Sequence, residues 1–417
     1  MKVMSLRRRR NALCAIILII NSLSYVMGAE EEDYDGSLEE EEEDSGEKVT
    51  RKSIREDSTL KVDKLIAKYG YESEVHEVTT EDGYILKMHR IRNTGKQPVF
   101  LQHGLVDSSA GYVIMGPNVS LAYLLADLNY DVWLGNARGN RYSRNHTTLD
   151  PDESKFWDFS WHEIGMYDLP AMIDYVLLTT GFKRIQYIGH SQGCTSFFVM
   201  CSMRPEYNRK IISMHALAPA AYLSDTEDHP YIKVIDLYLK SLVGSSIREL
   251  FTGEFRFLCS VTKETRQTCI EAIFTIAGRD EEEFNEKMFP VVLGHYPAGA
   301  SAKQIKHFVQ IIKTNRFAPY SYSVSKNLAL YKEHLPPKYD LTKVKVPVYL
   351  YYSLNDLLVQ PSNVEQLFRD LGNPVSKYLV PYKEFNHMDF LWASNVRILL
   401  YDEVIRNLKK LRALELE

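Results

Sequence analysis

The spacing of apolar and polar positions predicts strands and helices that follow one another along most of the chain. Two alternating runs around the turn Glu81-Asp82-Gly83 predict a hairpin over 73–91. Short apolar runs then predict strands at 98–102, 130–135, 184–188, 212–218, 344–352 and 378–380. Helices are predicted between them at 121–128, 161–178 and 194–203. This alternation predicts an α/β fold, with a mostly parallel central sheet flanked by helices on both faces.

The alternation of strands and helices stops near Pro219 and resumes at residue 344. The intervening residues are mostly helical in pattern, with helices predicted at 231–242 and 304–313, and a last helix is predicted at 390–411. About 360 residues follow the N-terminal segments, which is long for one compact core. We therefore predict a core in two parts, 57–219 and 344–417, with a helical cap inserted at 220–343.

The first 28 residues have the layout of a secretory signal peptide. Arg7 to Arg10 are basic, residues 12–20 are continuously apolar, and the small residues Gly28 and Ala29 follow. A signal anchor is the alternative, but nine apolar residues are too few to span a bilayer comfortably. No later stretch is long and apolar enough to be a transmembrane segment. We therefore expect a secreted protein without a transmembrane segment.

An acidic tract follows the leader and is expected to be disordered over residues 29–56. Residues 30–47 contain twelve Asp or Glu and no Lys or Arg, so they cannot bury apolar surface. A cleaved pro-segment is the alternative, because Arg51-Lys52 and Arg55 are possible protease sites. The chain carries −5 in total, of which the leader contributes +5 and the tract −12, leaving +2 for the rest. This near-neutral remainder gives no indication of a nucleic-acid partner, and its twelve histidines would make it cationic in acid.

The cysteines and two sequons fit an oxidising, extracellular route. Cys259 and Cys269 close a short polar loop and are the predicted disulfide. Cys194 and Cys201 are seven residues apart on a predicted helix and are expected to pack as small buried side chains. Asn118 and Asn145 each begin an N-glycosylation sequon.

The sequence Gly189-His190-Ser191-Gln192-Gly193 lies between a predicted strand and a predicted helix. A G-x-S-x-G pattern in this position is typical of a nucleophile elbow, a tight turn that exposes the serine hydroxyl. A serine hydroxyl needs a general base, and the base needs an acid that fixes its tautomer. Ser191 is therefore the predicted nucleophile.

The order Ser, then Asp or Glu, then His limits the partners of Ser191. Asp356 follows the first strand after the cap, and His387 is the only histidine beyond it. Asp389 is a weaker alternative for the acid, because it begins a predicted helix, where Asp is a common cap. Backbone N–H groups of Gln192 and Leu105 are the predicted oxyanion donors. His103 and His190 are expected to be structural.

These segments together resemble the animal acid lipase family, which includes gastric and lysosomal acid lipases. The segments that carry the resemblance are 83–86, 103–105, 131–140, 156–160, 167–170, the elbow, 355–358 and 386–390. They span almost the whole mature chain, from about Lys61 to Leu408. Two positions depart from the usual family pattern, since Val106 replaces a leucine and Cys194 a threonine.

The resemblance implies an α/β-hydrolase fold with a helical cap and lid, and the same triad and oxyanion residues as above. It implies hydrolysis of lipid esters without a metal, and the sequence contains no cofactor motif or zinc-ligand spacing. We expect a secreted serine lipase acting on triacylglycerol-type lipids at a lipid–water interface. An esterase for sterol esters or small esters, an inactive lipid-binding homologue, and a lysosomal destination are the alternatives.

Overall fold

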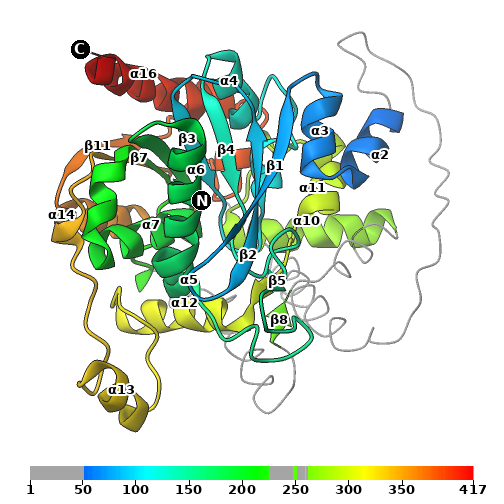
Figure 1. The fold of residues 1–417 in the computed structure, drawn as a ribbon. Coiled ribbons are helices and arrows are strands. Elements are labelled where there is room, and N and C mark those ends of the chain that lie inside the picture. The colour runs from blue at the N-terminus through cyan, green and yellow to red at the C-terminus, as the bar shows by residue number, and fades with distance from the viewer. Residues whose placement is uncertain (1–50, 225–247, 251–258, 260–261, 417) are drawn as a thin grey trace.

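The computed structural model describes residues 51–224, 248–250, 259 and 262–416. A nine-stranded sheet forms its centre, with eight strands in the order β1-β2-β4-β3-β6-β7-β10-β11 and β5 paired to β2 (Figure 1). The strands are β1 (Ser73–Thr79), β2 (Tyr84–Ile91), β3 (Pro98–Gln102), β4 (Asp131–Gly135), β5 (Asn145–His146), β6 (Ile185–His190), β7 (Ile211–Leu217), β10 (Val348–Tyr352) and β11 (Pro374–Leu379). All pairings from β4 across to β11 are parallel, whereas β1, β2 and β4 pair antiparallel. The predicted hairpin and the mostly parallel sheet are confirmed.

Helices cover both faces of the sheet and create two hydrophobic cores. Within β3, Phe100 belongs to one core, whereas Val99 and Leu101 belong to the other, as the alternation of side chains along a strand requires. The first core contains side chains of α6 (Leu169–Thr180), α7 (Gln192–Met203) and α14 (Pro361–Asp370). The second contains side chains of α3 (Val62–Lys68), α4 (Leu121–Asp127) and α16 (Asp402–Leu416).

The chain between β7 and β10 contributes four described α-helices of seven to fifteen residues, of which α12 and α13 lie below the central sheet in Figure 1. They are α10 (Lys263–Ala277), α11 (Phe289–His295), α12 (Ala302–Thr314) and α13 (Val324–Tyr331). A two-stranded pair, β8 (Glu249–Leu250) with β9 (Ala300–Ser301), joins two parts of this insertion. The helix predicted at 231–242 lies outside the described residues.

Two helices predicted as continuous are interrupted. The segment predicted at 161–178 is α5 (Trp161–Glu163), a π-helical turn at Ile164–Asp168 and then α6. A Cβ on Gly165 would lie 2.6 Å from the Ser196 carbonyl oxygen, so this turn packs directly on α7. The helix predicted at 390–411 is α15 (Asp389–Trp392), a break, a π-helical turn at Arg397–Tyr401 and α16.

The boundary predicted for the disordered tract is also wrong, because α2 (Arg51–Thr59) begins within it. The carbonyl of Asp57 accepts a hydrogen bond from His295 Nε2 (2.8 Å). The Asp57 carboxylate binds Lys68 Nζ (2.6 Å) and the Tyr69 hydroxyl (2.7 Å). Gly294 of α11 leaves no room for a Cβ beside Ser58. Specific contacts to α3 and α11 therefore hold this helix, and composition alone did not reveal them.

Candidate active site

Ser191 lies on the sharp turn between β6 and α7. Its backbone adopts φ 51° and ψ −115°, and its amide donates to the Leu217 carbonyl of β7 (2.9 Å). A Cβ on Gly189 would lie 2.9 Å from the Cys194 nitrogen, and one on Gly193 would overlap the Gln102 carbonyl of β3. Both glycines are therefore required by close backbone packing, which keeps the serine in its strained conformation. The predicted strand–turn–helix context of Ser191 is present.

Two long-range hydrogen bonds connect Ser191, His387 and Asp356. His387 Nε2 lies 2.9 Å from Ser191 Oγ, and His387 Nδ1 lies 2.8 Å from Asp356 Oδ2. Asp356 follows β10, His387 follows β11, and Ser191 follows β6. Because these strands are parallel, their carboxyl ends place the three side chains at one edge of the sheet. A Ser–His–Asp chain of hydrogen bonds can transfer the serine proton to the imidazole.

The Asp356 carboxylate is held by its own loop. Its Oδ1 accepts the amides of Leu358 and Val359, each at 2.8 Å, which leaves Oδ2 directed at His387. The side chain is buried, so few competing water contacts reach it. Two backbone donors to one oxygen fix the orientation that the imidazole requires.

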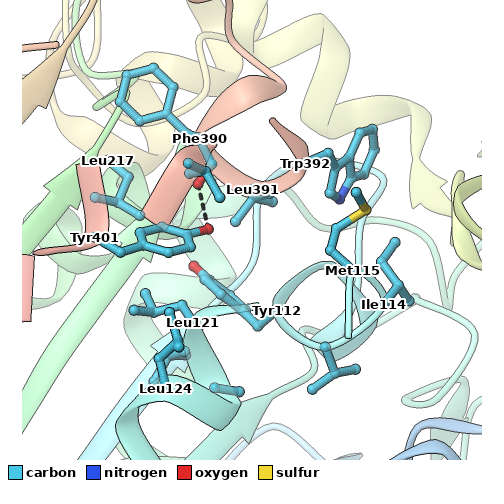
Figure 2. Packing of buried hydrophobic residues seen from close by; sticks show 14 of the residues in the cluster. Tyr112, Ile114, Met115, Leu121, Leu124, Leu217, Phe390, Leu391, Trp392 and Tyr401 are labelled. Carbon is cyan, nitrogen blue, oxygen red and sulfur yellow. Dashed lines mark hydrogen bonds between the residues drawn. The ribbon is translucent and has the colours of Figure 1, made fainter. Parts of the chain in front are cut away.

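The loop of His387 is anchored by the hydrophobic core that follows it. Helix α15 begins two residues later, and its Phe390, Leu391 and Trp392 pack among core side chains that include Tyr112 (Figure 2). The Tyr401 hydroxyl donates to the Phe390 carbonyl (2.7 Å), as the dashed line in Figure 2 marks. His190 Nε2 donates to the carbonyl of His387 itself (3.1 Å). The position of the imidazole is thus fixed from both sides of the loop.

The end of α10 supports the loops of both Asp356 and His387. The Ala277 carbonyl accepts the amide of Leu357 (3.3 Å) and the amide of His387 (3.2 Å). Gly278 follows with φ 115°, and a Cβ there would overlap the Asn355 carbonyl. The side-chain Nδ2 of Asn355 also donates to the Arg279 carbonyl (2.9 Å). The sequence did not predict this support, because any residue type supplies a backbone carbonyl. Gly278, which follows α10, is the feature of the sequence that could have indicated it.

Asp389, the alternative acid, faces away from this chain of hydrogen bonds. Its Oδ2 accepts the amide of Asn386 (2.6 Å), and its carboxyl group lies near that of Asp280. Burial and the neighbouring Asp280 carboxyl raise the pKa of Asp389 well above its usual value. Burial likewise raises the pKa of Asp280, which also accepts the Tyr382 hydroxyl (3.2 Å). Asp389 therefore shapes the turn around His387, but the cap role predicted for it is wrong, because Met388 is the N-cap and Asp389 is the first residue of α15.

The loop after β3 runs directly beside the serine. A Cβ on Gly104, the residue before Leu105, would lie 3.2 Å from Ser191 Cβ and 3.1 Å from His190 Nδ1. Gln192 is the first residue of α7, so its amide has no acceptor within the helix. Val106 adopts φ 56°, and its carbonyl accepts the Ala298 amide (2.6 Å) from the insertion. The insertion therefore holds this strained loop in place.

Comparison with known proteins identifies the family. Two family models match, the partial alpha/beta-hydrolase lipase region over residues 62–116 and the alpha/beta hydrolase fold over residues 97–249. Lipase 1 of Drosophila melanogaster is 72% identical over 370 residues, covering 89% of this chain and 84% of its own. The chain belongs to the acid lipase family. It is accordingly a carboxylic ester hydrolase of the lipase type.

More distant relatives extend the comparison. Gastric triacylglycerol lipase of Mus musculus is 38% identical and that of Homo sapiens 37%, covering 84% and 83% of this lipase and 91% and 90% of their own chains. The solved structure of a candidate lipase from Acinetobacter baumannii AYE aligns with a TM-score of 0.52 at 15% identity, over 88% of this chain and 99% of its own. At that identity the likeness shows the fold alone, which is the predicted α/β-hydrolase fold.

Two buried histidines near Ser191 have structural partners in this lipase. His103 Nδ1 donates to the Gly104 carbonyl (2.7 Å), and its Nε2 accepts the Ala137 amide (3.1 Å). Burial lowers the pKa of His103 to about 4, so the ring stays neutral and able to accept. Burial and the nearby His387 also lower the pKa of His190. The geometry gives both rings structural contacts.

The remaining sequence predictions concern covalent features of this lipase. Cys259 and Cys269 form a disulfide with a Cα–Cα distance of 5.8 Å, whereas Cys194 and Cys201 are buried free thiols. The sequon asparagines Asn118 and Asn145 are both exposed. Among the described residues, no helix is long and apolar enough to cross a membrane.

Proposed function

We propose that this lipase hydrolyses the ester bonds of neutral lipids of the triacylglycerol type, with Ser191, His387 and Asp356 as the catalytic triad. One observation carries the proposal: the continuous hydrogen-bonded chain from Ser191 Oγ through His387 to Asp356, at 2.9 and 2.8 Å. A serine placed on a strained elbow and paired with an oriented imidazole is equipped for nucleophilic attack on an acyl carbonyl.

The first half-reaction forms an acyl-enzyme. Ser191 Oγ attacks the ester carbonyl carbon while its proton moves to His387 Nε2. Asp356 holds the neutral tautomer with Nδ1–H and stabilises the imidazolium cation that forms. The tetrahedral intermediate collapses when His387 returns the proton to the departing alcohol oxygen. The free diacylglycerol or other alcohol then leaves the site.

The amides of Leu105 and Gln192 are the proposed donors to the oxyanion. Fixed backbone donors stabilise the negative oxygen without reorganisation, and each contributes on the order of 10²-fold to the rate. In the second half-reaction His387 takes a proton from water, the hydroxide attacks the acyl-enzyme, and the fatty acid leaves as Ser191 is reprotonated. No metal or cofactor takes part in the proposed steps.

The substrate class is supported by the relatives of this lipase. Four relatives that are 36–38% identical are named gastric triacylglycerol lipases, which favours triacylglycerols over sterol esters or small soluble esters. The leader sequence, the disulfide and the exposed sequons Asn118 and Asn145 support a secreted, glycosylated protein. A lysosomal destination is the alternative, and localisation of the full chain in cells separates the two.

The proposal is tested by assaying Ser191→Ala on emulsified triolein, a sterol ester and a dissolved short-chain ester. We expect the parent to prefer triolein and the variant to lose about 10⁴-fold or more of every rate. Cys201→Ala, a buried substitution on the same helix, is the matched control and should keep activity. Full activity of Ser191→Ala would refute the triad, and a preference for the sterol ester or the dissolved ester would refute the substrate class.

A further inference from the structure

A short segment that includes α13 projects from the insertion after α12. We define the projection as residues 323–338, which comprise α13 and the turn behind it; α13 lies beyond α12 at the lower edge of Figure 1, away from the central sheet. Asn327 organises it from inside: its amide nitrogen donates to the Tyr322 carbonyl (3.3 Å) and the His334 carbonyl (2.8 Å). Its Oδ1 accepts the Tyr322 amide (2.8 Å). A fully used buried asparagine gives the projection a defined shape.

Large apolar side chains are concentrated on the surface of the projection. Val324 and Leu330 are each 55% exposed, Leu335 is 52% exposed and Leu328 is 41% exposed. These four are over a third of the eleven large apolar side chains that are exposed in the described part of the chain. Val324 and Leu328 share one face of α13, whereas Leu330 lies on the opposite face, so the apolar side chains surround the projection instead of forming one flat patch. Several exposed apolar residues on one projecting element mark a surface that contacts another phase or molecule, whereas scattered single ones need no explanation.

The charges around these side chains are mostly positive. Three exposed lysines, Lys326, Lys332 and Lys338, accompany a single exposed carboxylate, Glu333. Lys326 Nζ lies 3.7 Å from the centre of the Tyr322 ring, so its apolar stem and the ring lie together at the base of α13. Exposed leucines flanked by lysines are typical of segments that insert at an anionic lipid surface.

We propose that the projection docks this lipase on an anionic lipid–water surface, with its leucines among the acyl chains and its lysines on the headgroups. This inference rests on the proposed function, since it identifies the surface that presents the substrate. The complementary charge favours a lipid surface over a second copy of the chain, whose projection would carry the same positive charge. Docking holds the insertion against the lipid and leaves the hydrogen-bonded triad unchanged.

The test compares matched surface variants. The double variant Leu328→Gln/Leu330→Gln removes two of the apolar side chains proposed to contact the acyl chains. The double variant Lys326→Gln/Lys332→Gln removes two of the positive charges proposed to contact the headgroups. Leu178→Gln and Lys64→Gln are the controls, because Leu178 is 84% exposed on α6 and the Lys64 side chain is 70% exposed on α3. Binding is measured by flotation with phosphatidylcholine vesicles, with and without about a third of phosphatidylglycerol. Hydrolysis is measured with emulsified triolein and with a dissolved short-chain ester.

We expect the leucine variant to bind both vesicle types at least about tenfold more weakly. It should lose activity on emulsified triolein and keep its activity on the dissolved short-chain ester. The lysine variant should lose roughly tenfold on phosphatidylglycerol vesicles and little on neutral ones. Parent-like vesicle binding by the leucine variant would overturn the docking. A parent dimer that this variant dissolves without any loss of vesicle binding would instead assign the surface to a second copy. A parent that binds vesicles but hydrolyses no ester would refute the proposed function and leave the docking intact.

Discussion

At the scale of single residues, the structure distinguishes two aspartates that the sequence offers as alternatives for the acid. Asp356 Oδ2 lies 2.8 Å from His387 Nδ1, whereas Asp389 Oδ2 accepts the backbone amide of Asn386. The proposed mechanism therefore assigns the acid to Asp356, and the two carboxyl groups should respond differently to the same substitution.

We expect Asp356→Asn to lower kcat about 10³- to 10⁴-fold, because asparagine cannot stabilise the required tautomer and its cation. The amides of Leu358 and Val359 can still bind the asparagine oxygen, so the fold should persist. The measurement is kcat on a dissolved ester, with circular dichroism as a check on folding. Asp389→Asn is the matched control and should cost far less in kcat; a larger loss in the control than in Asp356→Asn would reassign the acid.

The sequence predicts that Ser191, Asp356 and His387 lie together, because the chemistry of such a site imposes an order along the chain. Only one histidine follows Asp356, so order alone leads to His387. The contacts that hold the triad were not predicted. The Ala277 carbonyl that joins Leu357 to His387 belongs to a distant element, and any residue type supplies a carbonyl. Side-chain chemistry is visible in a sequence, whereas backbone support depends on tertiary structure.

At the scale of elements, the predicted strands agree with the structure within a few residues, and the long helices do not. Strands inside a parallel sheet are buried on both faces, so they appear in the sequence as short continuous apolar runs. The segment after Trp161 keeps a helical pattern, but the close approach of Gly165 to α7 accompanies a π-helical turn. Packing between two helices produces this irregularity, and a pattern along one helix cannot reveal it.

The junction between α10 and the triad loops gives a prediction at this scale. Gly278→Ala should destabilise the fold by at least about 3 kcal/mol, because its φ of 115° is strained for alanine and its Cβ would overlap the Asn355 carbonyl. A displaced Asp356 loop should also lower kcat, by about a hundredfold for a shift near 1 Å. Urea unfolding and kcat on a dissolved ester measure the two effects.

Gly181→Ala is the matched control for that change. Gly181 ends α6 with φ 75°, and nothing lies within 4 Å of the position of its Cβ. Alanine there should cost only about 1 kcal/mol from the backbone and leave kcat unchanged. Equal losses in both variants would mean that the contact between α10 and the Asn355 loop does not matter.

At the scale of the whole molecule, buried histidines and buried carboxyl groups act in opposite directions on pH stability. Burial lowers the pKa of His89 and His103 to about 4, and that of His215 and His307 to about 3. In the unfolded chain these rings bind protons below about 6.5, so stability falls as the pH falls below that value. Burial raises the pKa of Asp107 to about 7, which has the opposite effect.

Asp107 should therefore limit stability on the alkaline side. The folded protein keeps its proton up to about pH 7, whereas the unfolded chain releases it near pH 4, so stability is lost as the pH rises between these values. Asp107→Asn reproduces the protonated side chain and can still accept the Ser108 amide (2.7 Å in the parent). We expect parent and variant to be about equally stable at pH 4, with the variant more stable by up to about 4 kcal/mol at pH 8. Urea unfolding at both pH values measures this difference.

A difference in unfolding free energy that is the same at pH 4 and pH 8 would show that folding does not change the titration of Asp107. The alkaline limit would then have to come from other buried carboxyl groups such as Asp280 and Asp389.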